Sequence, residues 1–117
     1  MHALSLLALF LPLVAARHHK MCTCRTYTMG HSVWETNSDL AHWICNKIFL
    51  PTALWQDDIQ RCVAREGSHD NQIDGDDWEN QCIYHGTRAG YFPLDAAGNP
   101  TSSTVLRVNN ALGQCFQ

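Results

Sequence analysis

Hydrophobic and polar positions follow two different patterns in the first half of the chain, one typical of a strand and one of a helix. Residues 21–28 are rich in threonine, tyrosine and cysteine, which suit strands. Residues 36–50 carry apolar side chains at spacings of three and four, namely Leu40, Trp43, Ile44 and Ile48. Thr36 or Ser38 can cap this helix, and Pro51 prevents its continuation. We therefore predict a strand at 21–28 and a helix within 36–50.

A second helix is predicted over residues 75–85. Asp74 can cap its start, and the first turn is acidic, which the positive end of a helix dipole favours. Trp78 and Cys82 lie four residues apart, so they share one face of the helix. Gly86 follows the last helical residue. We expect the face with Trp78 and Cys82 to be buried.

The segment between the two helices, residues 53–66, fits two descriptions. It can form a helix capped by Thr52, with apolar residues at helical spacing. Its last part, Arg61–Arg65, also alternates polar and apolar residues as a half-buried strand does. We favour a strand at 60–65, followed by a turn at Gly67–Ser68.

Two more strands are predicted near the C-terminus. Residues 90–94 and 104–108 are rich in aromatic and branched side chains, and they flank the turn-rich segment 95–100. The resulting order, strand-helix-strand-helix-strand-strand, predicts an α+β fold in which two helices pack on a small, mainly antiparallel sheet. The chain contains no repeat or linker that would divide it, so we expect a single domain over residues 22–117.

The first 16 residues differ from the rest of the chain. They contain no Lys, Arg, Asp or Glu, and they end in Val14-Ala15-Ala16, which offers the small residues that signal peptidase accepts. We predict a signal peptide at 1–16 and a flexible basic tail at 17–21. No later apolar run is long enough to span a membrane. We therefore expect a secreted, extracellular protein without a transmembrane segment.

Six cysteines follow the predicted cleavage point and would meet an oxidising compartment after export. We expect three disulfides among Cys22, Cys24, Cys45, Cys62, Cys82 and Cys115. Sequence alone does not determine the pairing. In an extended segment, Cys22 and Cys24 would lie two residues apart on one strand face, so we expect them to bond to different partners.

Charge and motif patterns argue against an enzyme and against a nucleic-acid binder. The formal net charge is −3 at pH 7, which does not favour contact with a phosphate backbone. His85 or His69 could pair with Glu66 as the acid and base of a ribonuclease, with Arg65 holding a phosphate. No spacing connects these residues. We predict no catalytic residues, and a small secreted ribonuclease remains the enzymatic alternative.

One acidic segment can be compared with a calcium-binding loop. Its carboxylates occupy ligand positions of an EF-hand loop at Asp70, Asp74 and Asp76. The loop departs from the pattern at its last position, where Gln81 replaces the bidentate glutamate. An acidic helix start explains the same residues, and we favour it.

Two histidines near the predicted N-terminus are candidates for copper binding. Cleavage after Ala16 would make His19 the third residue, and cleavage one residue earlier would make His18 the third. A terminal amine, two amides and such an imidazole form a square-planar nitrogen site that suits Cu(II). A solvated tail is the simpler interpretation. We predict no metal ion or other cofactor, and a monomeric protein.

Four tryptophans divide into two groups by position. Trp43 and Trp78 lie on the apolar faces of predicted helices, so we expect them in the core. Trp34 and Trp55 lie in segments that flank a helix. An exposed aromatic side chain there could anchor a partner protein or a wall glycan, and we take Trp34 and Trp55 as candidate partner-binding residues.

Residues 22–85 carry the features of a known group of proteins. These features are Cys22-x-Cys24, a helix with Trp and Cys, Arg61-Cys62-Val63-Ala64, and Ile73-Asp74-Gly75-Asp76-Asp77-Trp78-x-x-x-Cys82. Because of these features, the chain resembles the small secreted cysteine-rich proteins of plant-associated fungi. Many of those proteins are candidate effectors. Some of these have folds similar to fungal killer toxins, with two helices against a disulfide-tied sheet.

The resemblance implies a secreted virulence-associated or interaction protein, acting outside or inside a host cell, and it carries over no catalytic residue. Our functional hypothesis is an effector-like protein without catalytic activity that acts on a host protein or a cell-wall component. The alternatives are the small secreted hydrolase, with ribonuclease first, and a membrane-active toxin of the killer type.

Overall fold

The sheet is built around strand β2 (Met21–Thr28). We describe residues 18–65 and 72–116 from a computed structural model of the chain. Strand β7 (Asn110–Phe116) pairs with β2 along one edge, from Met21 to Tyr27. The other edge of β2 is shared: β5 (Arg61–Ala64) pairs with its start and β3 (His31–Thr36) with its end. β2 is therefore the strand that connects the sheet.

Strand β4 (Ala53–Gln56) completes the sheet by pairing with β5. The strands follow the order β7-β2-β5-β4, with β3 beside the end of β2, and these pairs are all antiparallel. One helix follows the β2–β3 hairpin and another lies between β5 and β7. Helix α2 (Ser38–Ile44) lies between β2 and β4 in the chain, and β5 lies between these two strands in the sheet. This connectivity is the split β-α-β arrangement.

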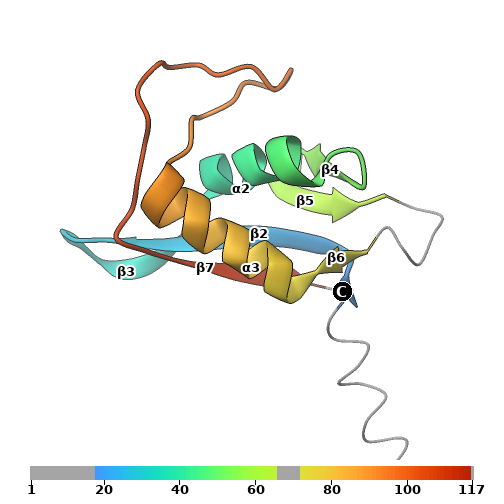
Figure 1. Ribbon diagram of the computed structural model, residues 1–117, viewed down its shortest axis with the longest axis horizontal. Coiled ribbons are helices and arrows are strands. Elements are labelled where there is room, and N and C mark those ends of the chain that lie inside the picture. The colour runs from blue at the N-terminus through green and yellow to red at the C-terminus, as the bar shows by residue number, and fades with distance from the viewer. Residues whose placement is uncertain (1–17, 66–71, 117) are drawn as a thin grey trace, which may run out of the picture.

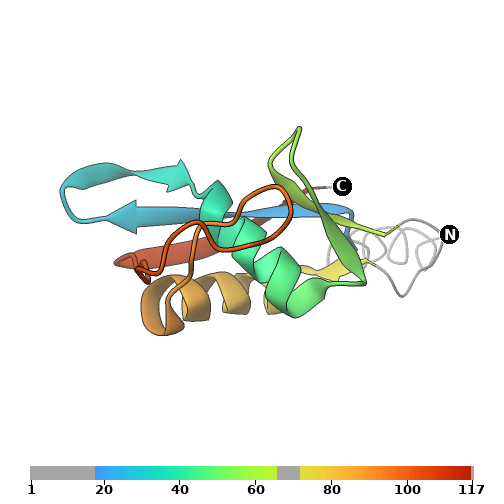
Figure 2. The same cartoon turned by 90° about the horizontal axis from the view of Figure 1, so that it is seen from above.

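Both helices continue into a short π-helical turn. Helix α2 (Ser38–Ile44) leads into η1 (Cys45–Phe49), and helix α3 (Gly75–Tyr84) leads into η3 (His85–Ala89). Figures 1 and 2 show the two helices beside each other against the sheet, with the loop between η3 and β7 passing over α2. The predicted α+β fold with two helices on a mainly antiparallel sheet is confirmed.

The caps of the two helices were predicted with different success. Asp74 caps α3 as expected: its Oδ1 accepts the backbone N–H of Asp76 at 2.9 Å and that of Asp77 at 3.3 Å. For α2 the prediction of Thr36 or Ser38 is wrong. Asn37 lies between them and accepts the Leu40 N–H through Oδ1 at 3.0 Å. Asn and Ser are similarly good caps, so composition does not distinguish neighbouring candidates.

Three disulfides tie the described elements together, and all six cysteines are paired. Cys22 and Cys24 have different partners, as predicted. Cys22 bonds to Cys115 directly across the β2–β7 pair, and Cys24 joins β2 to α3 through Cys82. The third bridge, Cys45–Cys62, joins η1 to β5. The bridges therefore fasten both helical segments and the last strand to the sheet.

The core lies between the helices and one face of the sheet. Its fully buried members come from every layer, and they include Cys22, Cys24, Leu40, Ala41, Ile44, Cys45, Cys62, Trp78 and Cys82. Helix α3 approaches β7 closely at Gly113, where an added Cβ would lie 2.8 Å from Glu79 Cα. Glycine is needed here because a helix backbone occupies the space of a side chain.

Several strand predictions need correction. The favoured strand at 60–65 is confirmed as β5, but the residues before it, which fitted a helix or a strand, form a second strand, β4, so that β4 and β5 make a hairpin. Strands β3 and β7 were not predicted. Residues 90–94 and 104–108 form no described strand and meet at one isolated bridge, Tyr91–Leu106, while Leu94 forms another isolated bridge with Pro100. Pro93 and Pro100 have no N–H to donate, which limits a longer ladder.

The predicted flexible tail at 17–21 is wrong over its described part. His18–His19 form β1, which pairs with β6 (Ile73–Asp74) just before α3, and Met21 begins β2. This segment is extended because its backbone pairs with residues far along the chain, and composition does not reveal such pairs. The predicted signal peptide and the predicted turn at Gly67–Ser68 lie outside the described residues.

Candidate functional site

An apolar hollow of the described surface lies beside α2. It has a volume of about 610 Å³. Its floor and rim come from one helical residue and from the long loop, defined here as residues 90–109: Trp43, Phe92, Pro100, Thr101, Ser102 and Ser103. In Figure 1 this loop, in orange and red, rises from the end of η3 and passes over α2 before it returns to β7. We call this feature the apolar hollow.

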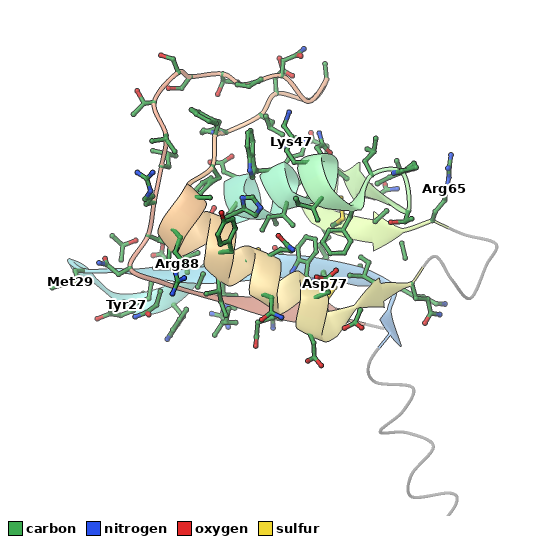
Figure 3. The ribbon with its side chains drawn as sticks, in the orientation of Figure 1. Tyr27, Met29, Lys47, Arg65, Asp77 and Arg88 are labelled. Carbon is green, nitrogen blue, oxygen red and sulfur yellow. A yellow bond between two sulfur atoms is a disulfide. The ribbon has the colours of Figure 1, made fainter. Side chains whose placement is uncertain are left out.

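Trp43 is the central side chain of the apolar hollow. It is half-buried, and its ring packs against Phe92 with the centroids 5.3 Å apart. Lys47 lies four residues further along, with Nζ 5.1 Å from the Trp43 ring centroid, a cation–π distance. Figure 3 shows Lys47 projecting toward the long loop. The hollow therefore presents an aromatic surface with a single positive charge at its edge.

The indole N–H of Trp43 has no acceptor. Trp43 Nε1 is shielded from solvent and donates no hydrogen bond within the described residues. A buried indole N–H normally has a partner, and leaving it without one costs free energy. Hydroxyl groups of Thr101, Ser102 and Ser103 form the opposite rim. A ligand with both an apolar face and a hydrogen-bond acceptor suits this lining.

Hydrogen bonds within the long loop hold its shape. Asp95 Oδ1 accepts the N–H groups of Ala97 at 3.0 Å and Asn99 at 2.9 Å, which closes the tip. Tyr91 and Leu106 exchange two backbone hydrogen bonds of 3.0 and 2.9 Å at the base. The rim residues of the apolar hollow are therefore fixed by local bonds, and they do not depend on a longer strand ladder.

The two predicted partner-binding tryptophans lie elsewhere. Trp34 on β3 is 39 % exposed and lies near Tyr27, with ring centroids 5.9 Å apart. Figure 3 shows Tyr27 near the end of the β2–β3 hairpin, remote from the apolar hollow. Trp55 is half-buried and stacks on His42, so much of one ring face is already covered. A binding role for Trp34 and Trp55 stays a prediction.

Sequence reasoning did not identify Trp43 as a surface residue. The helical spacing placed it in the core, and it does pack against the core in part. The spacing of Trp43 and Lys47, four residues apart on one helical face, was the available signal. The contribution of the long loop has no local signal, because it depends on where that loop crosses the helix.

The calcium and copper candidates are only partly described. Asp74 and Asp76 belong to the helix start, and the cap of α3 accounts for Asp74 without a metal ion. Asp70 lies outside the described residues. Across 18–65 and 72–116, no three His, Cys, Asp or Glu side chains gather as a metal site requires. His18 and His19 are described by their backbone in β1, and copper binding by them stays untested.

The described part of the ribonuclease candidate is not assembled. His85 begins η3, and Arg65 follows the end of β5. Figure 3 shows Arg65 and Arg88, another residue of η3, at opposite ends of the molecule. His69 and Glu66 lie outside the described residues. Arg65 therefore does not reach His85 as the predicted phosphate-holding residue would need to.

His42 on α2 is a buried titratable group. It is 6 % exposed and stacks on Trp55, with ring centroids 4.6 Å apart and planes 9° from parallel. Burial lowers the pKa of His42 below its ordinary value, although nearby carboxylates raise it in part, namely Asp57, Asp39 and Asp95. Burial also lowers the pKa of His85. Both side chains therefore favour the neutral form in the folded state.

We expect this burial to make the protein less stable in mild acid. The unfolded chain, with a histidine pKa near 6.5, takes up a proton before folded His42 does. The stabilising contribution of neutral His42 is complete above about pH 6.5 and is lost as the pH falls toward the folded-state pKa. Urea unfolding over a pH series should show this loss, and His42→Gln should make the dependence shallower. An unchanged pH dependence in His42→Gln would contradict the assignment.

Comparison with known proteins gives no further assignment. No protein-family model, curated protein or solved structure matches this chain. In the part of the chain that the structure describes, no helix is long and apolar enough to cross a membrane.

Proposed function

We propose that this chain is a secreted, effector-like interaction protein without catalytic activity, which acts on a host protein or a cell-wall component. The apolar hollow carries the proposal, because it combines a partly exposed tryptophan, the neighbouring ring of Phe92 and a rim held by local hydrogen bonds. Tryptophan is the residue type most often found at the energetic centre of binding interfaces.

The three disulfides support the extracellular part of the proposal. Disulfides of this density in a small domain are typical of extracellular proteins, since cytosolic thiols are kept reduced. The apolar first 16 residues, with small residues at the expected cleavage point, supply a route to that compartment. The resemblance to secreted proteins of plant-associated fungi points the same way.

The small number of positive charges near the apolar hollow favours an apolar partner over a nucleic acid. The ammonium nitrogen of Lys47 lies 5.1 Å from the centroid of the Trp43 ring, and no Lys or Arg is among the described residues that line the hollow. One positive charge is too little for a phosphate backbone, which binding proteins contact with several basic side chains. An apolar or aromatic segment with a nearby acceptor fits the lining better than a nucleic acid does.

The proposal is tested by binding of the secreted, oxidised protein to host extracellular fluid and to isolated cell-wall fractions. Trp43→Ala should weaken retention by about 30-fold if Trp43 is an interface centre. Phe92→Ala should act in the same direction. Tyr84→Ala is the matched control, because Tyr84 is 52 % exposed on α3 and does not line the hollow.

Three results would count against the proposal. Retention that is unchanged in Trp43→Ala and Phe92→Ala, with both variants folded by near-UV circular dichroism, would exclude the apolar hollow as the binding surface. Hydrolysis of RNA by the wild-type protein, lost in His85→Ala and retained in Val33→Ala, which changes a residue that is 59 % exposed on β3, would establish the ribonuclease alternative. Leakage of lipid vesicles would instead favour the membrane-active toxin.

A further inference from the structure

A second hollow, which is polar, lies where the β2–β3 hairpin meets the start of α2. It has a volume of about 550 Å³. Seven of its nine lining residues carry a hydroxyl or carboxylate group: Thr26, Thr28, Glu35, Thr36, Ser38, Asp39 and Tyr91, with Asn37 and Val108. Figure 2 shows β3 leading directly into α2 and the long loop crossing nearby. We call this feature the polar hollow, and it shares no lining residue with the apolar hollow.

Asn37 fixes the hydrogen bonding of the polar hollow. Its Oδ1 accepts the backbone N–H of Leu40 at 3.0 Å. A backbone N–H can only donate, so the amide cannot be turned the other way. Its Nδ2 then donates to Tyr91 Oη at 2.9 Å and to Thr26 Oγ1 at 3.2 Å. Both N–H groups of the amide are therefore used.

The two hydroxyl groups bonded to Asn37 are left with protons to donate. Each accepts from Asn37, so the proton of each must find a different acceptor. Neither Tyr91 Oη nor Thr26 Oγ1 donates to any described residue. Tyr91 is 5 % exposed and Thr26 7 %, so most of each side chain is buried, and both residues line the polar hollow. Two unused donors from buried residues thus belong to one hollow, and an unused buried donor costs free energy.

Carboxylates on the rim limit what can occupy the polar hollow. Glu35 and Asp39 are exposed and line it together with the hydroxyl groups. Their negative charge disfavours an anion. An ammonium group would pair with the carboxylates, but it has no lone pair to accept from Tyr91 and Thr26. The occupant must accept hydrogen bonds at the buried end, donate them at the rim, and carry no net negative charge.

An alcohol hydroxyl group meets both requirements, because it donates one hydrogen bond and accepts two. We propose that the polar hollow binds a neutral saccharide unit, whose hydroxyl oxygens accept from Tyr91 and Thr26 and whose hydroxyl protons donate to Glu35 and Asp39. The volume lies within the range of small-ligand sites. The proposal rests on the binding role proposed above and assigns a ligand class to a different set of residues.

Burial of Tyr91 keeps its phenol group protonated. The pKa of Tyr91 is raised, chiefly by burial and in part by the charge of Asp39, against the hydrogen bond from Asn37. The phenol therefore stays protonated and able to donate at neutral and acidic pH. Loss of the phenol proton should accordingly not limit saccharide binding at neutral or acidic pH.

Nuclear magnetic resonance of the oxidised protein tests the proposal. The probes are neutral oligosaccharides of glucose (β-1,3 and β-1,4 linked), N-acetylglucosamine, xylose and mannose, with oligogalacturonate as the anionic and oligoglucosamine as the cationic comparison. At least one neutral oligosaccharide should shift the backbone amide signals of Thr26, Glu35 and Asn37, and the charged oligosaccharides should bind more weakly.

Two variants examine the assigned bonds. Tyr91→Phe keeps the ring and removes the hydroxyl, and it should raise the saccharide Kd about tenfold. Tyr84→Phe is the matched control, since it makes the same change at an exposed residue outside the polar hollow, and its Kd should equal that of the wild type. Glu35→Gln, at an exposed position that should not affect folding, should also weaken binding and should relieve the exclusion of oligogalacturonate.

The proposal is overturned if the whole neutral panel leaves these amide signals unchanged at millimolar concentration, which would mean that water fills the polar hollow. Saccharide binding with the same Kd in Tyr91→Phe and Glu35→Gln would also overturn it. If binding to wall fractions still depends on Trp43 in either case, only the saccharide site fails and the proposed function stands.

Discussion

Trp78→Ala should lower the free energy of unfolding by about 3 to 5 kcal/mol, the usual cost of removing a large aromatic side chain from a core. Trp78 is fully buried and packs against Phe49, with ring centroids 5.3 Å apart. Its Nε1 donates to the carbonyl oxygen of Thr23 at 2.8 Å, which ties α3 to the central strand β2. No small side chain could fill this space or make this bond.

Two further substitutions separate the parts of the Trp78 effect. Trp78→Phe keeps an aromatic ring and loses the N–H, so it should cost less than Trp78→Ala while leaving the Thr23 carbonyl without this donor. Trp34→Ala, at a residue that is 39 % exposed, should change stability by no more than about 0.5 kcal/mol. Equilibrium urea unfolding measures all three. A Trp78→Ala loss similar to that of Trp34→Ala would show that the core is not arranged around Trp78.

Local signals predicted the parts of the fold that depend on local interactions. Helix α3 was predicted to within a residue, because the cap at Asp74 and the acidic first turn act within one turn of the chain. Helix α2 was predicted from its apolar spacing, although its cap was placed one residue away from Asn37. The geometry of an extended strand predicted that Cys22 and Cys24 bond to different partners, but it did not identify Cys115 and Cys82 as those partners.

The elements that the sequence did not predict depend on distant contacts. β7 contains Asn, Gly and Gln, which are poor strand formers, yet it pairs with β2 over seven residue pairs. It is extended because β2, 93 residues earlier at Cys22–Cys115, offers an open edge. Gly113, which weakens the local prediction, is the residue that lets α3 approach. Residue propensity therefore disfavours a strand at 110–116, whereas packing against β2 and α3 favours one, and packing has the larger effect.

Neither hollow could be predicted from the sequence, because each is lined by residues that are distant in the chain. The polar hollow combines residues near positions 26, 37 and 91, and the apolar hollow combines Trp43 with residues of the long loop. Tyr91 was predicted within a strand over 90–94. In the structure it forms only an isolated antiparallel bridge with Leu106. The function of a side chain such as Asn37 becomes visible only when both of its hydrogen-bond partners are known.

The three disulfides should differ in what they contribute to stability, in the order of the chain length they close. A disulfide stabilises mainly by restricting the unfolded chain, and the effect grows with loop length. The sequence separations are 93 for Cys22–Cys115, 58 for Cys24–Cys82 and 17 for Cys45–Cys62. For each bridge formed alone, the chain-entropy relation gives contributions of ~4.7, ~4.2 and ~3.1 kcal/mol respectively.

Three double Cys→Ala variants, each missing one bridge, test this order. Urea unfolding of the oxidised proteins should show the smallest loss without Cys45–Cys62. The losses without Cys22–Cys115 and without Cys24–Cys82 should be similar and each about 0.7 kcal/mol larger, because with one of these two bridges intact the other closes a loop of only about 36 residues. Mass spectrometry under denaturing conditions confirms that the other two bridges have formed. The loss of packing is similar for each pair, since all six positions except Cys115 are fully buried.

The opposite order would have a definite physical meaning. If removal of Cys45–Cys62 cost the most, the native packing of η1 against β5 would outweigh chain entropy, and the unfolded state would already be compact across the longer loops. The expected order instead means that the two bridges that close the longer loops, Cys22–Cys115 and Cys24–Cys82, contribute most by restricting the unfolded chain. The strand with the weakest local propensity, β7, would then owe its place in the sheet both to β2 and to Cys115.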